Sequence, residues 1–154
     1  MSAVDGNGTM LLMRRLLLGA ILVGMVGTIG ELYLLDHYET AWQVVPMAAL
    51  GVGILLVGLV LVRPTRGPVR ALRLLLLAYL VVGGLGIWRH YLGNAAFELE
   101  RHPDLRGLTL LWEAARGATP ALAPGTMVQI GLFGLIALWR HPAGAAAARP
   151  SAPP

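Results

Sequence analysis

The stretch RRLLLGAILVGMVGTIGELYLLD, residues 14–36, decides the fold of this chain. Two arginines precede twenty residues, 16–35, in which Glu31 is the only charged side chain. A run of this length matches the roughly 20 residues that an α-helix needs to cross about 30 Å of hydrocarbon. It lacks the alternation of apolar and polar residues that is typical of membrane β-strands. The stretch therefore predicts a transmembrane helix.

Three further apolar segments follow, at residues 41–62, 74–92 and 120–139. The whole chain has 154 residues, of which 56% are hydrophobic and only 13% are charged. Soluble domains carry roughly 25% charged residues and do not tolerate so much exposed apolar surface. The sequence predicts an all-α integral membrane protein, with a four-transmembrane-helix bundle in residues 1–141.

The arginines indicate the orientation of this bundle. Eight of the twelve belong to one side by this topology: Arg14, Arg15, Arg63, Arg66, Arg70, Arg73, Arg140 and Arg149. Because basic residues concentrate in cytoplasmic loops, both termini are expected in the cytoplasm, in a multi-pass protein of a plasma or inner membrane. The Ala/Pro-rich residues 142–154 are predicted to be a disordered cytoplasmic tail.

A cleavable signal peptide is the competing interpretation of the first segment. Two arginines before an apolar run are typical of such peptides, and Thr28 and Gly30 would form a poor cleavage site. The apolar residues 32–35 continue past that site, which favours an uncleaved span.

The second outer loop contains two predicted helical features. Span three is expected to continue as a helix until Pro103, which would place His90, Asn94, Glu98 and His102 on one slowly drifting stripe. An early break of the helix at Gly93 is the alternative, and it would scatter this stripe. An amphipathic outer helix is predicted at residues 104–116, with Gly117 capping its end. Such a helix would lie flat at the interface or cover the mouth of the bundle.

A two-plus-two tandem repeat is a further hypothesis. A gapless shift of 58 positions lays Arg15 and the three following leucines over Arg73 and the three leucines after it, and Glu31 over Arg89. Spans two and four share Pro46 with Pro124 at a shift of 78. Chance matches between leucine-rich helices are the alternative explanation.

The repeat brings Glu31 and Arg89 to the same predicted depth. Fifteen residues separate each of them from an inner arginine, Arg15 or Arg73. An ionised carboxylate inside the bilayer costs roughly 2.5–3.5 kcal/mol on insertion scales, so Glu31 should have a partner. We expect an intramembrane ion pair between Glu31 and Arg89; separate snorkelling of each side chain to the interface is the alternative.

The outer loops also gather metal-ligating residue types. The candidates for a polar or metal cluster are His37, Glu39, His90, Glu98 and His102. Imidazole and carboxylate are ligands for Zn, Fe or Cu, but no dense ligand motif is present. Which metal or cofactor would bind, if any, is not indicated.

Several function classes are excluded or disfavoured. The chain has no Cys, which removes disulfide and thiolate chemistry. The arginines lack the aromatic interleaving of nucleic-acid binders, so no nucleic-acid partner is expected. No nucleophile–base pair or phosphate loop appears, and a non-enzyme is favoured over an enzyme.

The leading hypothesis is an accessory or assembly subunit stabilised by the Glu31–Arg89 pair, with the lipid bilayer and either a membrane-protein partner or further copies of itself around it. One alternative is a small ion- or proton-coupled transporter or channel, with Gln43 and Gln129 also lining its path. The other is a metal- or haem-binding membrane redox protein with an outward-facing site.

Overall fold

The computed structural model describes residues 3–145, and all the regular structure among them is helical. The six helices are α1 Ala3–Leu34, α2 Ala41–Val62, α3 Arg66–Arg101, α4 Gly107–Ala115, α5 Gly125–Ala137 and α6 Pro142–Ala145. Three of them, α1, α2 and α3, are long and apolar enough to cross a membrane. The predicted all-helical class is thus confirmed, and these three helices agree with the prediction of a membrane protein.

α2 has the bounds predicted for the second span, because its flanks carry strong local signals. Asp36 adopts a left-handed backbone conformation, with a φ of 51°, and lets the chain turn after α1. At the start of α2 the Gln43 side chain accepts a hydrogen bond from the Thr40 amide at 2.8 Å. This bond satisfies an N–H group that the first helical turn leaves without a backbone partner.

α5 is shorter than the predicted fourth span, with 13 residues against the 20 of segment 120–139. Pro120 and Pro124 delay its start, because proline lacks the amide hydrogen needed inside a helix. Residues 121–124 form tight turns, with the Ala123 amide bonded to the Pro120 carbonyl at 3.2 Å. At the other end Arg140 has a φ of 46°, which turns the chain away from the helix axis.

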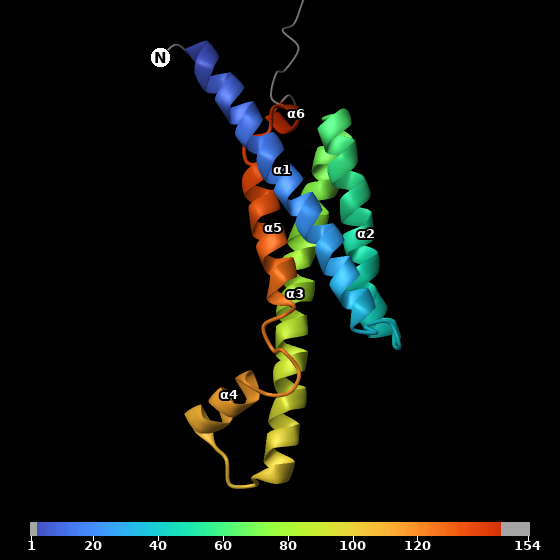
Figure 1. Cartoon of the computed structure of the whole chain (residues 1–154). Helices are drawn as coiled ribbons and strands as arrows, with labels where there is room; N and C mark the ends of the chain where they lie inside the picture. Colours follow the sequence, from blue (N-terminus) through green and yellow to red (C-terminus); the bar gives the residue numbers. More distant parts are fainter. Residues whose placement is uncertain (1–2, 146–154) are drawn as a thin grey trace, which may run out of the picture. The chain divides into compact units, whose positions relative to one another are not determined.

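The chain divides into two compact units, each described by itself. The first comprises residues 1–78 and 130–154 and so contains α1, α2, the start of α3 and most of α5. In Figure 1 the helix α1 runs obliquely across α2 and α5. Its buried face carries Leu18, Ile21 and Met25. The core of this unit therefore joins segments from both ends of the chain.

Gly134 lets α5 lie very close to its neighbours in the first unit. A Cβ atom added there would be 2.6 Å from a methyl carbon of Leu76 on α3 and 3.2 Å from one of Ile21 on α1. Small residues at such crossings are how helices gain dispersion contacts in a bilayer, where no hydrophobic effect drives them together.

The second unit comprises residues 79–129. Here α3 continues unbroken through Gly93 to Arg101, as the sequence predicted. α4 begins three residues later than expected, because Arg106 donates hydrogen bonds to the carbonyls of Pro103 and Leu105 at 2.6 and 2.7 Å and holds a turn there. Gly107, with a φ of 57°, then starts the helix.

The predicted tail is only partly described. Residues 142–145 form α6, whereas the rest of the segment expected to be disordered, 146–154, lies outside the described residues.

Candidate functional site

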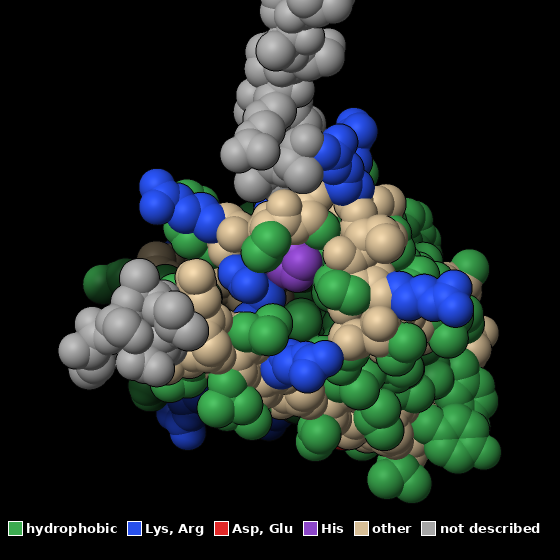
Figure 2. All heavy atoms as spheres, turned by 90° about the horizontal axis from the view of Figure 1, so that it is seen from above, with side chains coloured by type: hydrophobic (Ala, Val, Ile, Leu, Met, Phe, Trp, Pro, Cys, Tyr) green, Lys and Arg blue, Asp and Glu red, His purple; other side chains and the backbone are tan. Residues whose placement is uncertain are grey.

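The first unit has one strongly cationic end, which we call the arginine end. It carries the arginines in the first half of α1, between α2 and α3, in the first turns of α3 and after α5: Arg14, Arg15, Arg63, Arg66, Arg70, Arg73 and Arg140. Figure 2 looks onto this end and shows arginine side chains spread around a single histidine. The described acidic side chains of this unit, Glu31, Asp36 and Glu39, belong to its opposite half.

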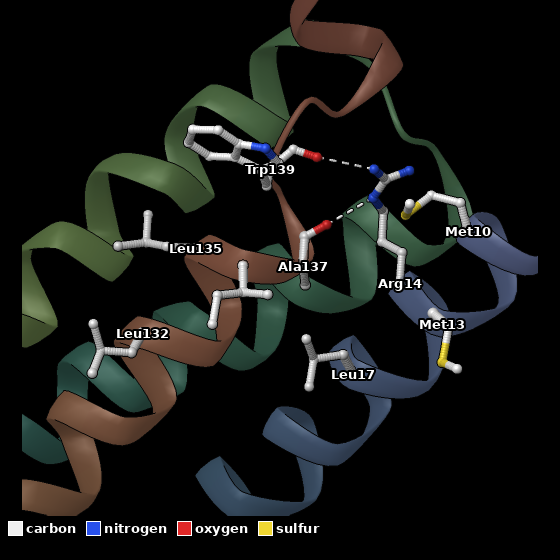
Figure 3. A pocket seen from close by; sticks show the side chains of 9 residues that line it. Met10, Met13, Arg14, Leu17, Leu132, Leu135, Ala137 and Trp139 are labelled. Carbon is white, nitrogen blue, oxygen red and sulfur yellow. Dashed lines mark hydrogen bonds between the residues drawn. The ribbon is translucent and has the colours of Figure 1, made fainter. Parts of the chain in front are cut away.

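Arg14 is the most enclosed of these arginines, with 9% of its surface exposed. Its Nε donates to the Ala137 carbonyl at 2.7 Å and its Nη2 to the Trp139 carbonyl at 3.1 Å, as Figure 3 shows. Arg73 adds a bond from Nη2 to the Leu138 carbonyl at 2.9 Å. The last carbonyls of a helix have no partner within it and carry partial negative charge. Two guanidinium groups therefore neutralise the end of α5.

His141 is buried beside these two arginines. Its Nδ1 accepts a hydrogen bond from the Ala143 amide at 3.2 Å, so its proton is on Nε2. Burial, and then the positive charges of Arg14 and Arg73, lower the pKa of this imidazole below its ordinary value of 6.5. His141 is accordingly neutral at physiological pH.

An apolar groove opens between α1 and α5 beside Arg14, with a volume of about 410 Å³. Figure 3 shows the side chains of both helices that face it. The lining residues are Met10, Met13, Arg14, Leu17, Leu132, Leu135, Ile136, Ala137 and Trp139. On the other side of Arg14 lies a second hollow of about 230 Å³, where Arg15 and His141 join apolar residues of α1 and α2. Arg14 therefore separates an apolar site from a more cationic one.

The predicted ion pair involves one residue from each unit. Glu31, in the first unit, is exposed near the end of α1, and within the described part of that unit it has no ion-pair partner. Arg89, in the second unit, is also exposed, on α3. Their pairing remains a prediction.

The predicted outer cluster is likewise divided between the units. His37 and Glu39 belong to the first unit, and His90, Glu98 and His102 to the second. Among residues 3–145, no group of three or more His, Asp and Glu side chains is placed to hold a metal ion. Within the second unit, the Nδ1 of His90 donates to the Pro120 carbonyl at 3.0 Å. A metal site in this cluster remains a hypothesis.

Asn94 has a role that the predicted polar stripe did not suggest. It is 4% exposed, and its Nδ2 donates to the carbonyls of Ala114 and Thr119 at 2.9 and 2.7 Å. Its Oδ1 accepts from the Thr119 amide at 3.2 Å. Gly117, expected to cap the end of α4, does not have the positive φ that is common for a glycine at this position. A Cβ atom there would lie 2.4 Å from Cγ of Asn94, so glycine is required for this approach.

Comparisons of the chain with protein-family models, with curated proteins and with solved structures find no match.

Proposed function

We propose that this protein is an accessory or assembly subunit of a membrane complex, with four spans and both termini in the cytoplasm. The observation that carries the proposal is the exposed carboxylate of Glu31, the only charged side chain in segment 16–35. On lipid-facing surface such a group costs about 2.5–3.5 kcal/mol. A polar or basic partner, from Arg89 or from another polypeptide, would remove that cost.

The helix face around Glu31 is suited to close contact with another helix. Val23 and Gly27 precede Glu31 at intervals of four residues and lie on the same side of α1. Val23 and Gly27 are exposed, and a Cβ atom at Gly27 or Gly30 would meet nothing within 4 Å. Small residues near one another on an open face allow two helix backbones to approach.

The fourth crossing is part of the same proposal. Thirteen helical residues span about 20 Å, and the flanking turns at residues 120–124 and 138–140 would supply the remaining depth. The bonds from Arg14 and Arg73 satisfy the carbonyls of Ala137 and Leu138, at and just after the end of α5, without water, as backbone at membrane depth requires.

No specific observation favours either of the two alternative functions, a transporter or channel and a metal- or haem-binding protein. Gln43, expected along a transport path, is bonded to the Thr40 amide at the start of α2. The candidate ligands of a metal or haem site are not brought together among residues 3–145.

Site-specific photocrosslinking in cells tests the proposal. A benzoylphenylalanine at Val23 lies on the proposed face, and one at Leu55 on α2 is the matched control, because the two side chains are 74% and 73% exposed. We expect a protein adduct from position 23 that disappears in Glu31→Gln and persists in Glu39→Gln. Lipid adducts alone at position 23, or equal protein adducts at both positions, would contradict the proposal.

A charge exchange identifies which group faces Glu31. If Arg89 is the partner, Glu31→Arg combined with Arg89→Glu should restore the thermal stability that either single change lowers. If a second polypeptide is the partner, the exchange should not restore the adduct at position 23. A double variant as unstable as both singles together would overturn the intramolecular pair.

A further inference from the structure

The groove between α1 and α5 has the composition of an acyl-chain site. Its walls are formed by the side chains of Met13, Leu17, Leu132 and Leu135, which offer methyl and methylene groups and no hydrogen-bonding atoms. Trp139, 71% exposed, lies among the lining residues together with Arg14. Indole rings are typical of the boundary between acyl chains and headgroups. One end of the groove is therefore apolar, and the other is at headgroup depth.

The charge around this second end is strongly positive. Arg14 lines the groove itself, and the exposed Arg140 directly follows Trp139. The guanidinium of Arg14 uses only two of its N–H groups for backbone carbonyls, so its remaining N–H groups and those of Arg140 are available to a ligand. A phosphate accepts hydrogen bonds from guanidinium groups and is attracted by their charge.

We propose that this groove binds one anionic phospholipid, with an acyl chain along the apolar walls and the phosphate against Arg14 and Arg140. The argument is the continuity of a groove of about 410 Å³ with the arginine end, whose charge complements an anionic headgroup. Basic pockets between transmembrane helices are known to hold such headgroups. This inference does not depend on the proposed accessory role.

Quenching of Trp139 by brominated lipids tests the site directly. A variant with Trp42, Trp88 and Trp112 replaced by Phe leaves Trp139 as the single indole. The full chain is reconstituted into phosphatidylcholine vesicles containing equal mole fractions of brominated phosphatidylglycerol or brominated phosphatidylcholine. Bromine quenches only an indole that it contacts, so we expect stronger quenching by the anionic lipid. The expected preference is about fivefold in relative association, the size given by one basic residue at an anionic surface.

The matched reporter is Trp42, which is also 71% exposed but belongs to the opposite half of the first unit. In a variant that keeps Trp42 alone, the two brominated lipids should quench equally. An equal preference at Trp42 would show general attraction to the protein and would overturn the site. Little quenching of Trp139 by either lipid would show that protein covers the groove, which also overturns it.

Single charge removals separate a site from a surface potential. Arg140→Gln removes the exposed ligand and leaves the bonds of Arg14 to α5 in place, whereas Arg66→Gln removes the same charge from an exposed arginine that lines neither hollow. We expect Arg140→Gln to remove most of the preference at Trp139 and Arg66→Gln to leave most of it. Equal losses in the two variants would refute a defined phosphate position.

Discussion

Arg14 and Arg15 show how differently two adjacent identical residues are used. On a helix they point about 100° apart, so one can face the interior while the other faces outward. Arg14 is buried and bonds to the carbonyls of Ala137 and Trp139, whereas Arg15 is exposed. Arg14 therefore stabilises the end of α5, whereas Arg15 places its charge at the surface.

Replacing Arg14 should lower stability far more than replacing Arg15. Arg14→Met keeps the volume of the aliphatic stem but removes both hydrogen bonds to the end of α5. A bond from a charged donor contributes roughly 1.5–3 kcal/mol, so we expect a loss of about 3 kcal/mol. Thermal unfolding in mild detergent measures it, with Arg15→Met as the control. Equal melting temperatures for the two variants would disprove the role of Arg14.

His141 should make stability depend on pH. Its pKa is lowered in the folded protein by burial, Arg14 and Arg73, so the unfolded chain binds its proton more readily. Stability should be complete above pH 6.5 and should fall as the pH drops from there toward the lowered pKa. His141→Gln should flatten this part of the melting profile. The exposed His102→Gln serves as control, and an unchanged profile in His141→Gln would exclude His141 as the cause.

These residue roles were only partly predictable. The sequence indicates that arginines gather at one end, because that follows from local composition. It does not show which arginine turns inward, since this depends on where α5 ends, some 120 residues later. The available signal was the adjacency of Arg14 and Arg15, because two neighbouring residues of a helix cannot share one face, so only one of them can point inward.

At the scale of elements, the second unit depends on contacts of α3 with the end of α4 and with the segment that follows it. Asn94 binds both Ala114 and Thr119, and Gly117 leaves room for its side chain. The recurring polar residues on α3 predicted a polar stripe, but nothing local indicated that Asn94 faces a buried backbone.

Gly117→Ala should therefore destabilise the second unit. The added methyl group would overlap Asn94, and overpacking of this kind costs roughly 1–3 kcal/mol. Hydrogen exchange should become faster at the Thr119 amide, whose acceptor is Asn94. Gly93→Ala makes the same chemical change where a Cβ atom meets nothing within 4 Å, and it should be neutral or stabilising. Similar exchange rates at Thr119 in both variants would argue against the contact.

Local sequence signals predicted the bounds of some helices but not of others. α2 agrees with its predicted bounds, whereas α5 and α4 are shorter than expected. Hydropathy marks where a segment is apolar, but proline and the turn held by Arg106 decide where helical hydrogen bonding begins.

At the scale of the whole molecule, the proposed four crossings make a clear prediction. The chain has no cysteine, so single cysteines at Pro68, Asp104 and Gly144 report sidedness without background. An impermeant maleimide should label positions 68 and 144 from one side of the membrane and position 104 from the other. Label at 144 from the side of 104 would show that α5 does not cross; 68 and 104 on one side would overturn the topology.

The sequence predicted the helical class and the charge distribution because both arise from composition averaged over many residues. Contacts between residues far apart in the chain could not be predicted from the sequence. The proposed Glu31–Arg89 pair rests on equal depth along two helices, which periodicity can suggest, whereas rotation about each helix axis depends on packing across the bundle.

The arginine contacts to α5 have a consequence for biosynthesis. α1 and the start of α3 emerge from the ribosome long before residues 137–139 exist, so the guanidinium groups of Arg14 and Arg73 must wait for their carbonyl acceptors. Until then these two guanidinium groups lack the carbonyl acceptors that they have in the folded unit, and a chain interrupted ahead of α5 could not form these bonds. Completion of this unit thus waits for the translation of residues 137–139.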